Sequence, residues 1–136
     1  MFKYLLLAII ILTNTDVKAE IIPAKDLPEK IITIIVDENG TVFMGVDTLE
    51  INELANVLQD RLFKSYAGTG KMPASLKLQS APENLRNSVI AEIKKAQQNA
   101  LSDLCLHLHK KKYESLTSKQ QGKIKRKFPV LFQTDF

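Results

Sequence analysis

The sequence predicts an α+β fold in two layers, with a small mixed β-sheet, helices packed on one of its faces and an extra C-terminal helix. Residues 31–47 carry two runs of β-branched and aromatic residues on either side of Asn39-Gly40, which is a strong hairpin signal. Two later stretches repeat apolar residues at helical spacing, and two others alternate polar and apolar residues as half-buried strands do. The expected order is β-β-α-β-α-β, followed by the last helix.

The N-terminus predicts export from the cytoplasm. Residues 1–19 contain a basic start at Lys3, an apolar run over 5–12 and small residues up to Ala19, the pattern of a signal peptide. The run is shorter than the roughly 20 apolar residues that span a bilayer. We therefore expect a periplasmic protein, the alternative being a short N-terminal membrane anchor in the inner membrane. Residues 20–30 include two prolines and predict a linker.

The hairpin at residues 31–36 and 41–45 is expected to organise the sheet. Its first strand is apolar on both faces except at Thr33, which predicts a central strand covered on both sides. A helix is expected to begin at residues 47–50, with Asp47 or Thr48 as its cap and Glu50 completing a capping box.

The second half predicts a strand, a helix and another strand. Residues 75–79 alternate, and the Ser80 to Glu83 segment has the spacing of a second capping box. The helix that follows is expected to end near Asn99. Residues 101–109 alternate again and predict a last strand.

Charge is distributed unevenly along the chain. Residues 20–109 hold 9 basic and 12 acidic residues, a net charge of −3, whereas residues 110–127 hold 8 basic residues and Glu114, a net charge of +7. The basic part includes a final helix expected at about residues 117–127, which stops at Phe128-Pro129.

The hairpin and the elements after it resemble the periplasmic domain of the ExbD/TolR family of biopolymer-transport proteins. The resemblance lies in residues 34–47 (IIVDENGTVFMGVD), followed by a capped helix, a strand at 76–79, a helix at 85–100 and a strand at 104–109. It covers about residues 31–113. The basic helix and tail at residues 114–136 are an addition to the family pattern.

This resemblance implies a non-enzymatic periplasmic domain that works beside a proton-driven motor of the inner membrane. The implied partners are TonB-like or motor-complex subunits, peptidoglycan and a second copy of the chain. The family has a membrane helix with a proton-carrying aspartate, but Asp16 lies beyond the short apolar run, so that role is not transferred to it. Ser80 stands where family members often carry an aspartate.

Catalytic chemistry is not expected. The carboxylates of Asp37, Glu38, Asp47 and Glu50 fall at a turn and a helix cap, and no serine lies in a nucleophile-elbow motif. We expect no cofactor.

One candidate metal site lies in the predicted last strand. Cys105, His107 and His109 would share one strand face, and thiols and imidazoles bind zinc or copper. A closed site needs further ligands, and the chain has no other Cys or His. A polar strand face is the simpler interpretation, and a small periplasmic metal-binding protein is the alternative function.

The basic C-terminal helix is the most promising binding region. Its candidate residues for a partner or an anionic surface are Lys119, Lys123, Lys125, Arg126 and Lys127. Apolar residues follow them, a combination suited to anionic lipid headgroups or cell-wall polymers. Export argues against nucleic acid. A free sheet edge is a second candidate, because it can pair with a partner's strand.

Overall fold

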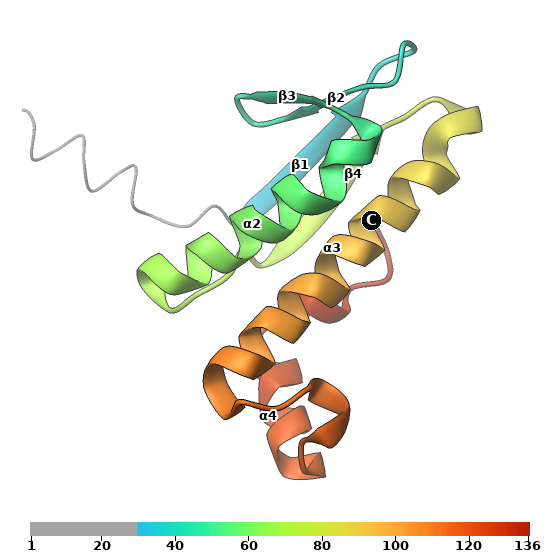
Figure 1. Ribbon diagram of the computed structural model, residues 1–136. Helices are drawn as coiled ribbons and strands as arrows, with labels where there is room; N and C mark the ends of the chain where they lie inside the picture. The colour runs from blue at the N-terminus through green and yellow to red at the C-terminus, as the bar shows by residue number, and fades with distance from the viewer. Residues whose placement is uncertain (1–29) are drawn as a thin grey trace, which may run out of the picture.

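The computed structural model describes residues 30–136, which form a two-layer α+β fold (Figure 1). The predicted fold class is confirmed. The signal-peptide prediction, and all of the linker prediction except Lys30, lie outside the described residues. Within them, no helix is both long enough and apolar enough to cross a membrane. In chain order the elements are β1 (Ile31–Val36), β2 (Thr41–Met44), β3 (Asp47–Glu50), α2 (Ile51–Thr69), β4 (Ser75–Ser80), α3 (Glu83–His109), η1 (Tyr113–Ser115), α4 (Ser118–Lys127) and η2 (Pro129–Phe132).

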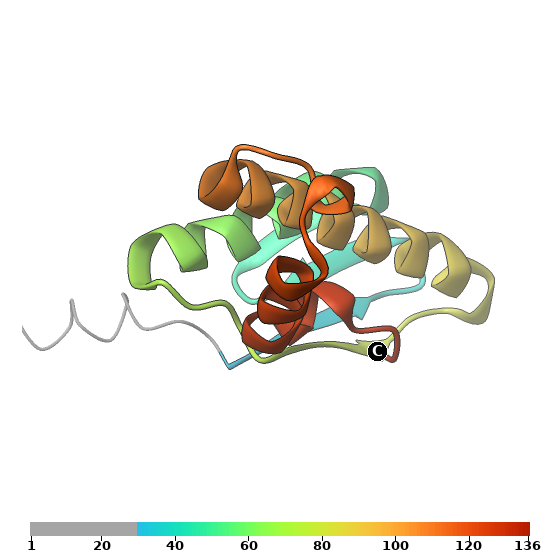
Figure 2. The same cartoon turned by 90° about the horizontal axis from the view of Figure 1, so that it is seen from below.

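The sheet is mixed, with the strand order β3-β2-β1-β4. β1 runs antiparallel to β2 and parallel to β4, so the prediction that it lies inside the sheet is correct. The prediction that both its faces are covered is wrong, because α2 and α3 both lie on one side of the sheet (Figure 2). Ile32 and Ile34 are fully buried beneath the helices, whereas Ile31, on the opposite face, is 50% exposed.

Residues 47–50 form the edge strand β3 and not the first turn of a helix, which corrects the prediction there. The turn between β2 and β3 includes Gly45, whose φ of 66° favours glycine. The helix begins at Ile51, and its capping box joins Glu50 to Glu53 in place of Asp47 to Glu50. Leu49 explains the difference, since its side chain joins the core from a strand position.

α3 continues to His109, so the predicted last strand at residues 101–109 is wrong. Asn99 does not end the helix, and Pro82, not Ser80, is its N-cap. Leu104 and Cys105 are buried at helical spacing from Ala100, which continues the apolar stripe through the expected strand. The order is therefore β-β-β-α-β-α.

The predicted C-terminal helix is confirmed as α4. Thr117 caps it and forms a capping box with Gln120. After α4 the chain turns back onto the body at η2, where Phe128, Val130 and Leu131 enter the same core as the sheet. The C-terminal residues thus belong to the packed body.

Candidate functional site

A cavity of about 390 Å³ is lined by residues from the last turns of α2 and α3 and from α4. We call it the basic groove. Apolar side chains make its floor and polar or basic side chains its rim. The floor residues are Tyr66, Leu108, Ile124 and Phe128, and the rim residues are His109, Lys119, Gln120, Lys123 and Lys127.

The lysines of the rim form a row along α4. Lys119, Lys123 and Lys127 are spaced four residues apart, so they lie on the same face of the helix. Among residues 30–136, none of the three lies within ion-pair distance of a carboxylate. Like charges at this spacing destabilise an isolated helix by a few tenths of a kcal/mol, about 0.2–0.5 per pair. The row therefore concentrates uncompensated positive charge on one side of the groove.

The floor is apolar because α2, α3 and α4 each contribute an apolar or aromatic side chain to it. Leu108 lies four residues after the buried Leu104, on the same side of α3. The end of α3 extends beyond the elements that bury Leu104, so Leu108 remains 42% exposed. Ile124 and Phe128 point from α4 and its C-cap into the body and are 3% and 2% exposed. Leu108 therefore supplies the part of the floor's apolar surface that the protein itself leaves exposed.

An aromatic cluster supports one wall of the groove. The ring of Tyr66 lies 5.5 Å from that of Phe128 and 5.8 Å from that of His107, both in edge-on geometry. Phe63, one turn earlier on α2, lies 6.0 Å from His107. Edge-to-face pairs of this kind fix ring orientation. Tyr66 is thus held between α3 and α4.

The five predicted basic residues do not act as one set. Lys119, Lys123 and Lys127 line the groove. Lys127 also lies over the ring of the floor residue Phe128, with its Nζ 5.7 Å from the ring centre. Lys125, in contrast, is outside the groove and lies over the ring of Phe132, with its Nζ 5.5 Å from the ring centre. Arg126 is not among the groove residues, and its guanidinium lies near Gly122.

Sequence reasoning missed the floor of the groove. Tyr66 lies more than 40 residues before Leu108 in the chain, and no local pattern connects them. A helical interpretation of residues 101–109 would have placed Leu108 on the apolar face of α3, four residues after Leu104. This helical spacing was the one signal in the sequence that could have identified Leu108 as a groove residue.

The proposed metal ligands are separated by the helix. Cys105 is fully buried in the core, His107 packs in the aromatic cluster, and His109 lines the groove. Residues two apart on a helix point in different directions, so His107 is turned away from the other two, and although Cys105 and His109 are four residues apart, Cys105 is fully buried while His109 lines the groove. Across the described part of the chain, no group of three or more His, Cys, Asp or Glu side chains is placed to hold a metal. Burial, and secondarily the charge of Glu114, raises the pKa of the Cys105 thiol above its ordinary value.

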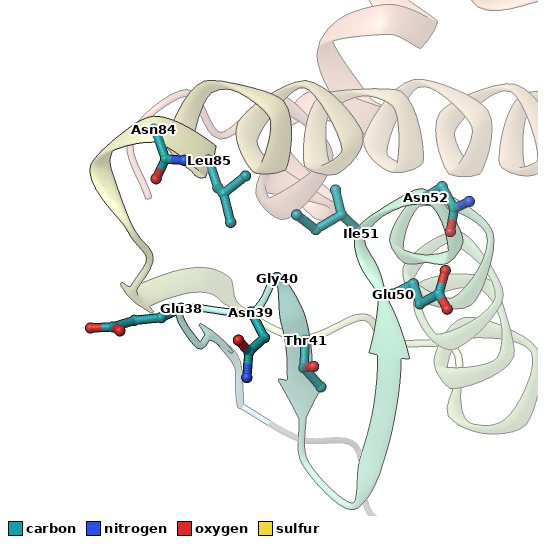
Figure 3. A pocket seen from close by; sticks show the side chains of 9 residues that line it. All are labelled: Glu38, Asn39, Gly40, Thr41, Glu50, Ile51, Asn52, Asn84 and Leu85. Carbon is teal, nitrogen blue, oxygen red and sulfur yellow. The ribbon is translucent and has the colours of Figure 1, made fainter.

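A second cavity of about 560 Å³ lies at the other end of the sheet, beside the turn between β1 and β2 (Figure 3). Ile51 and Leu85 face each other over Gly40, where an added Cβ would lie 3.7–3.8 Å from their methyl groups. Glu38 and Glu50 point away from each other. These carboxylates do not form an acid–base pair.

Asp37 of the predicted turn and Asp47 of the predicted helix cap both have structural contacts. The carboxylate of Asp37 accepts hydrogen bonds from the backbone of Asn39 and Thr41, each at 2.9 Å, so its predicted turn role is confirmed. Asp47 instead pairs with Arg61 of α2, which also donates to the Met44 carbonyl. That pair ties the β2–β3 hairpin to the helix.

The two sheet edges differ. β3 forms one edge, and β4 forms the other. At the β4 edge, the side-chain amide of Gln133 accepts from the Leu76 N–H at 2.8 Å and donates to the Leu76 carbonyl at 2.7 Å. The C-terminal segment thus occupies, at this residue, the position that a pairing strand would take.

Searches of protein-family models, curated proteins and solved structures found no match to the chain. The site is therefore interpreted from its geometry.

Proposed function

We propose that this protein is a non-enzymatic interaction domain of the cell envelope that binds an anionic partner through its basic C-terminal region. The observation that carries the proposal is the row of Lys119, Lys123 and Lys127, which has no carboxylate partner within the described residues. Among the described residues, the lysines at positions 110–112 form another exposed run, whereas Lys119, Lys123 and Lys127 together line one cavity with apolar side chains.

Clustered charge gives such a region its binding properties. Summed positive potential attracts anionic surfaces and polymers over about a Debye length, roughly 8 Å at physiological salt. Each contact is weak alone, so affinity depends on several lysines acting together. Binding of this kind falls steeply as salt concentration rises.

The envelope location and the kind of partner come from the resemblance to the ExbD/TolR periplasmic domain. Over residues 31–80 the chain has the hairpin, helix and strand that the resemblance implies, with β3 added between the hairpin and the helix, whereas residues 104–109 are the end of α3, where the resemblance implies a strand. Under this proposal the partners are peptidoglycan, an anionic membrane surface, TonB-like or motor-complex subunits, or a second copy of the chain. Nucleic acid is not among them.

The test is co-sedimentation of the purified protein with peptidoglycan sacculi and with vesicles that contain anionic lipid, at low and high salt. A variant with alanine at Lys123, Lys125, Arg126 and Lys127 should lose most of the low-salt binding. The matched control places alanine at four exposed lysines of the body, Lys71, Lys77, Lys94 and Lys95, and should retain it. Equal loss in both variants would contradict a role for the C-terminal region.

A further inference from the structure

We propose that the basic groove binds a single-chain anionic amphiphile, an alkyl chain that ends in a carboxylate. This inference rests on the proposed function, because it names a ligand class for the same region. It goes further in assigning the binding to one cavity and one face of α4.

The size of the groove favours a slender ligand. Its volume of about 390 Å³ lies at the lower end of the range of small-molecule sites, roughly 300–1,000 Å³. Lys119 and Lys127 are eight residues apart, so the lysine row is about 12 Å long at the rise of an α-helix. One alkyl chain laid along the floor fits this space.

The floor supplies apolar contacts along that length. Leu108 is 42% exposed, and the half-buried Tyr66 lines the same groove, with its ring 5.5 Å from that of Phe128. An alkyl chain placed there would remove the exposed part of Leu108 from water. Burial of apolar surface on both partners drives such binding.

The rim selects the charge of the head group. Three ammonium groups and His109 border the groove, and no acidic side chain is among its lining residues. A carboxylate near the row would receive charge-assisted hydrogen bonds from lysine. It would also relieve the repulsion between lysines four residues apart.

The orientation of α4 favours a free amphiphile over a bilayer surface. A helix that lies in a membrane interface turns its apolar side chains toward the lipid. On α4, Ile124 is 3% exposed and faces the protein, and Lys123 and Arg126 are exposed. The helix therefore has no apolar face to insert. The exposed apolar surface in this region is that of Leu108 on α3, which lines the groove.

The experiment titrates the purified protein with dodecanoate below its micelle concentration, and follows the side-chain methyl groups of Leu108 and Ile124 by NMR. Shifts should be saturable and confined to residues of the groove. Acetate tests the head group alone, and dodecyl maltoside tests a neutral amphiphile with the same chain. We expect binding of either control compound to be weaker than that of dodecanoate by about tenfold or more, because each lacks half of the recognised chemistry.

Two matched pairs of variants locate the site. K119Q/K123Q should weaken dodecanoate binding about tenfold, whereas K125Q/R126Q, with the same change in charge outside the groove, should leave it within about twofold. Leu108→Gln should weaken it, and Leu106→Gln should not, since Leu106 is equally exposed on α3 but does not line the groove. Thermal unfolding of each variant verifies its fold.

The proposal is overturned if the shifts do not saturate, if dodecyl maltoside or acetate binds as well as dodecanoate, or if the two lysine variants behave alike. Equal weakening by both lysine variants would still agree with the proposed function, which depends on total charge. If the unmodified protein binds dodecanoate but sediments with neither vesicles nor sacculi, the proposed function is overturned and the amphiphile site stays in place.

Discussion

Gln97 is the residue that fastens the C-terminal segment to the body. It lies on α3 and is 4% exposed, and its side-chain amide donates to the carbonyls of Val130 at 2.8 Å and Gln133 at 3.0 Å. A buried amide is tolerated because both of its N–H groups are bonded. One side chain therefore satisfies two carbonyls of a segment that belongs to no sheet.

Replacing Gln97 with leucine should destabilise the protein by about 1–3 kcal/mol, because two carbonyls lose their donor while the side-chain volume is nearly unchanged. Urea unfolding followed by circular dichroism measures this loss. Gln98→Leu is the control, since Gln98 is an exposed neighbour on the same helix. Equal stability of the two variants would show that the buried bonds contribute nothing.

For single residues, the sequence predicts which side chains are charged better than it predicts which side chains touch one another. The basic residues of α4 are evident from composition, but which of them share a cavity depends on helix phase relative to the body. Lys123 and Lys125 differ in this way, because one lines the groove and the other lies over Phe132. Gln97 carries no local signal, since a glutamine within a helix is usually exposed.

Among the elements, β4 is an edge strand protected by a side chain. Gln133 fills both main-chain hydrogen-bonding groups of Leu76. An uncovered edge invites pairing with another chain. The primary amide reproduces the donor and acceptor of a peptide group, and so covers the edge at Leu76 without a further strand.

Gln133→Ala should lower stability by about 1 kcal/mol and increase self-association, because the Leu76 groups become available to another strand. Analytical ultracentrifugation over a range of protein concentrations measures the association. Thr134→Ala, at the exposed neighbouring position, is the control. A Gln133→Ala protein that remains monomeric at every concentration would show that the edge is protected by other means.

Two elements differ from their sequence predictions for physical reasons. Residues 101–109 alternate polar and apolar side chains, but leucine also has high helix propensity, and neither glycine nor proline interrupts the segment. Residues 47–50 offer good caps, yet a hairpin pairs them with β2 from Thr41 to Met44. Strand pairing outweighed local capping there.

On the scale of the whole molecule, residues 114–136 complete the core. Leu116, Ile124, Phe128, Val130 and Leu131 are all at most 7% exposed and belong to the same cluster as the sheet. Burying side chains of this kind contributes about 1.5–3 kcal/mol each. Their sum is comparable to the total stability of a small domain, about 5–15 kcal/mol.

A protein truncated after Tyr113 should therefore lose its cooperative thermal transition, with a loss of stability on the order of 10 kcal/mol. Circular dichroism and the dispersion of amide resonances measure the effect. The full chain is the reference. A truncated protein with a sharp transition near that of the full chain would show that the core closes without the C-terminal segment.

The fold class is predictable because it follows from polar and apolar patterns within short segments of the sequence, such as those of the β1–β2 hairpin. The fold-back of the C-terminal segment is not predictable in this way. It depends on Phe128 and its neighbours meeting α2 and α3 across large sequence separations, and the groove exists because of that meeting. Such a site is a product of tertiary packing.

The chain contains three tyrosines and no tryptophan. Both tyrosines in the described residues touch the C-terminal segment, Tyr66 at 5.5 Å from the Phe128 ring and Tyr113 at 5.6 Å from the Phe132 ring. Tyrosine emission and near-ultraviolet circular dichroism are therefore intrinsic probes of whether that segment is docked. Occupation or opening of the region around α4 can be followed optically without any attached dye.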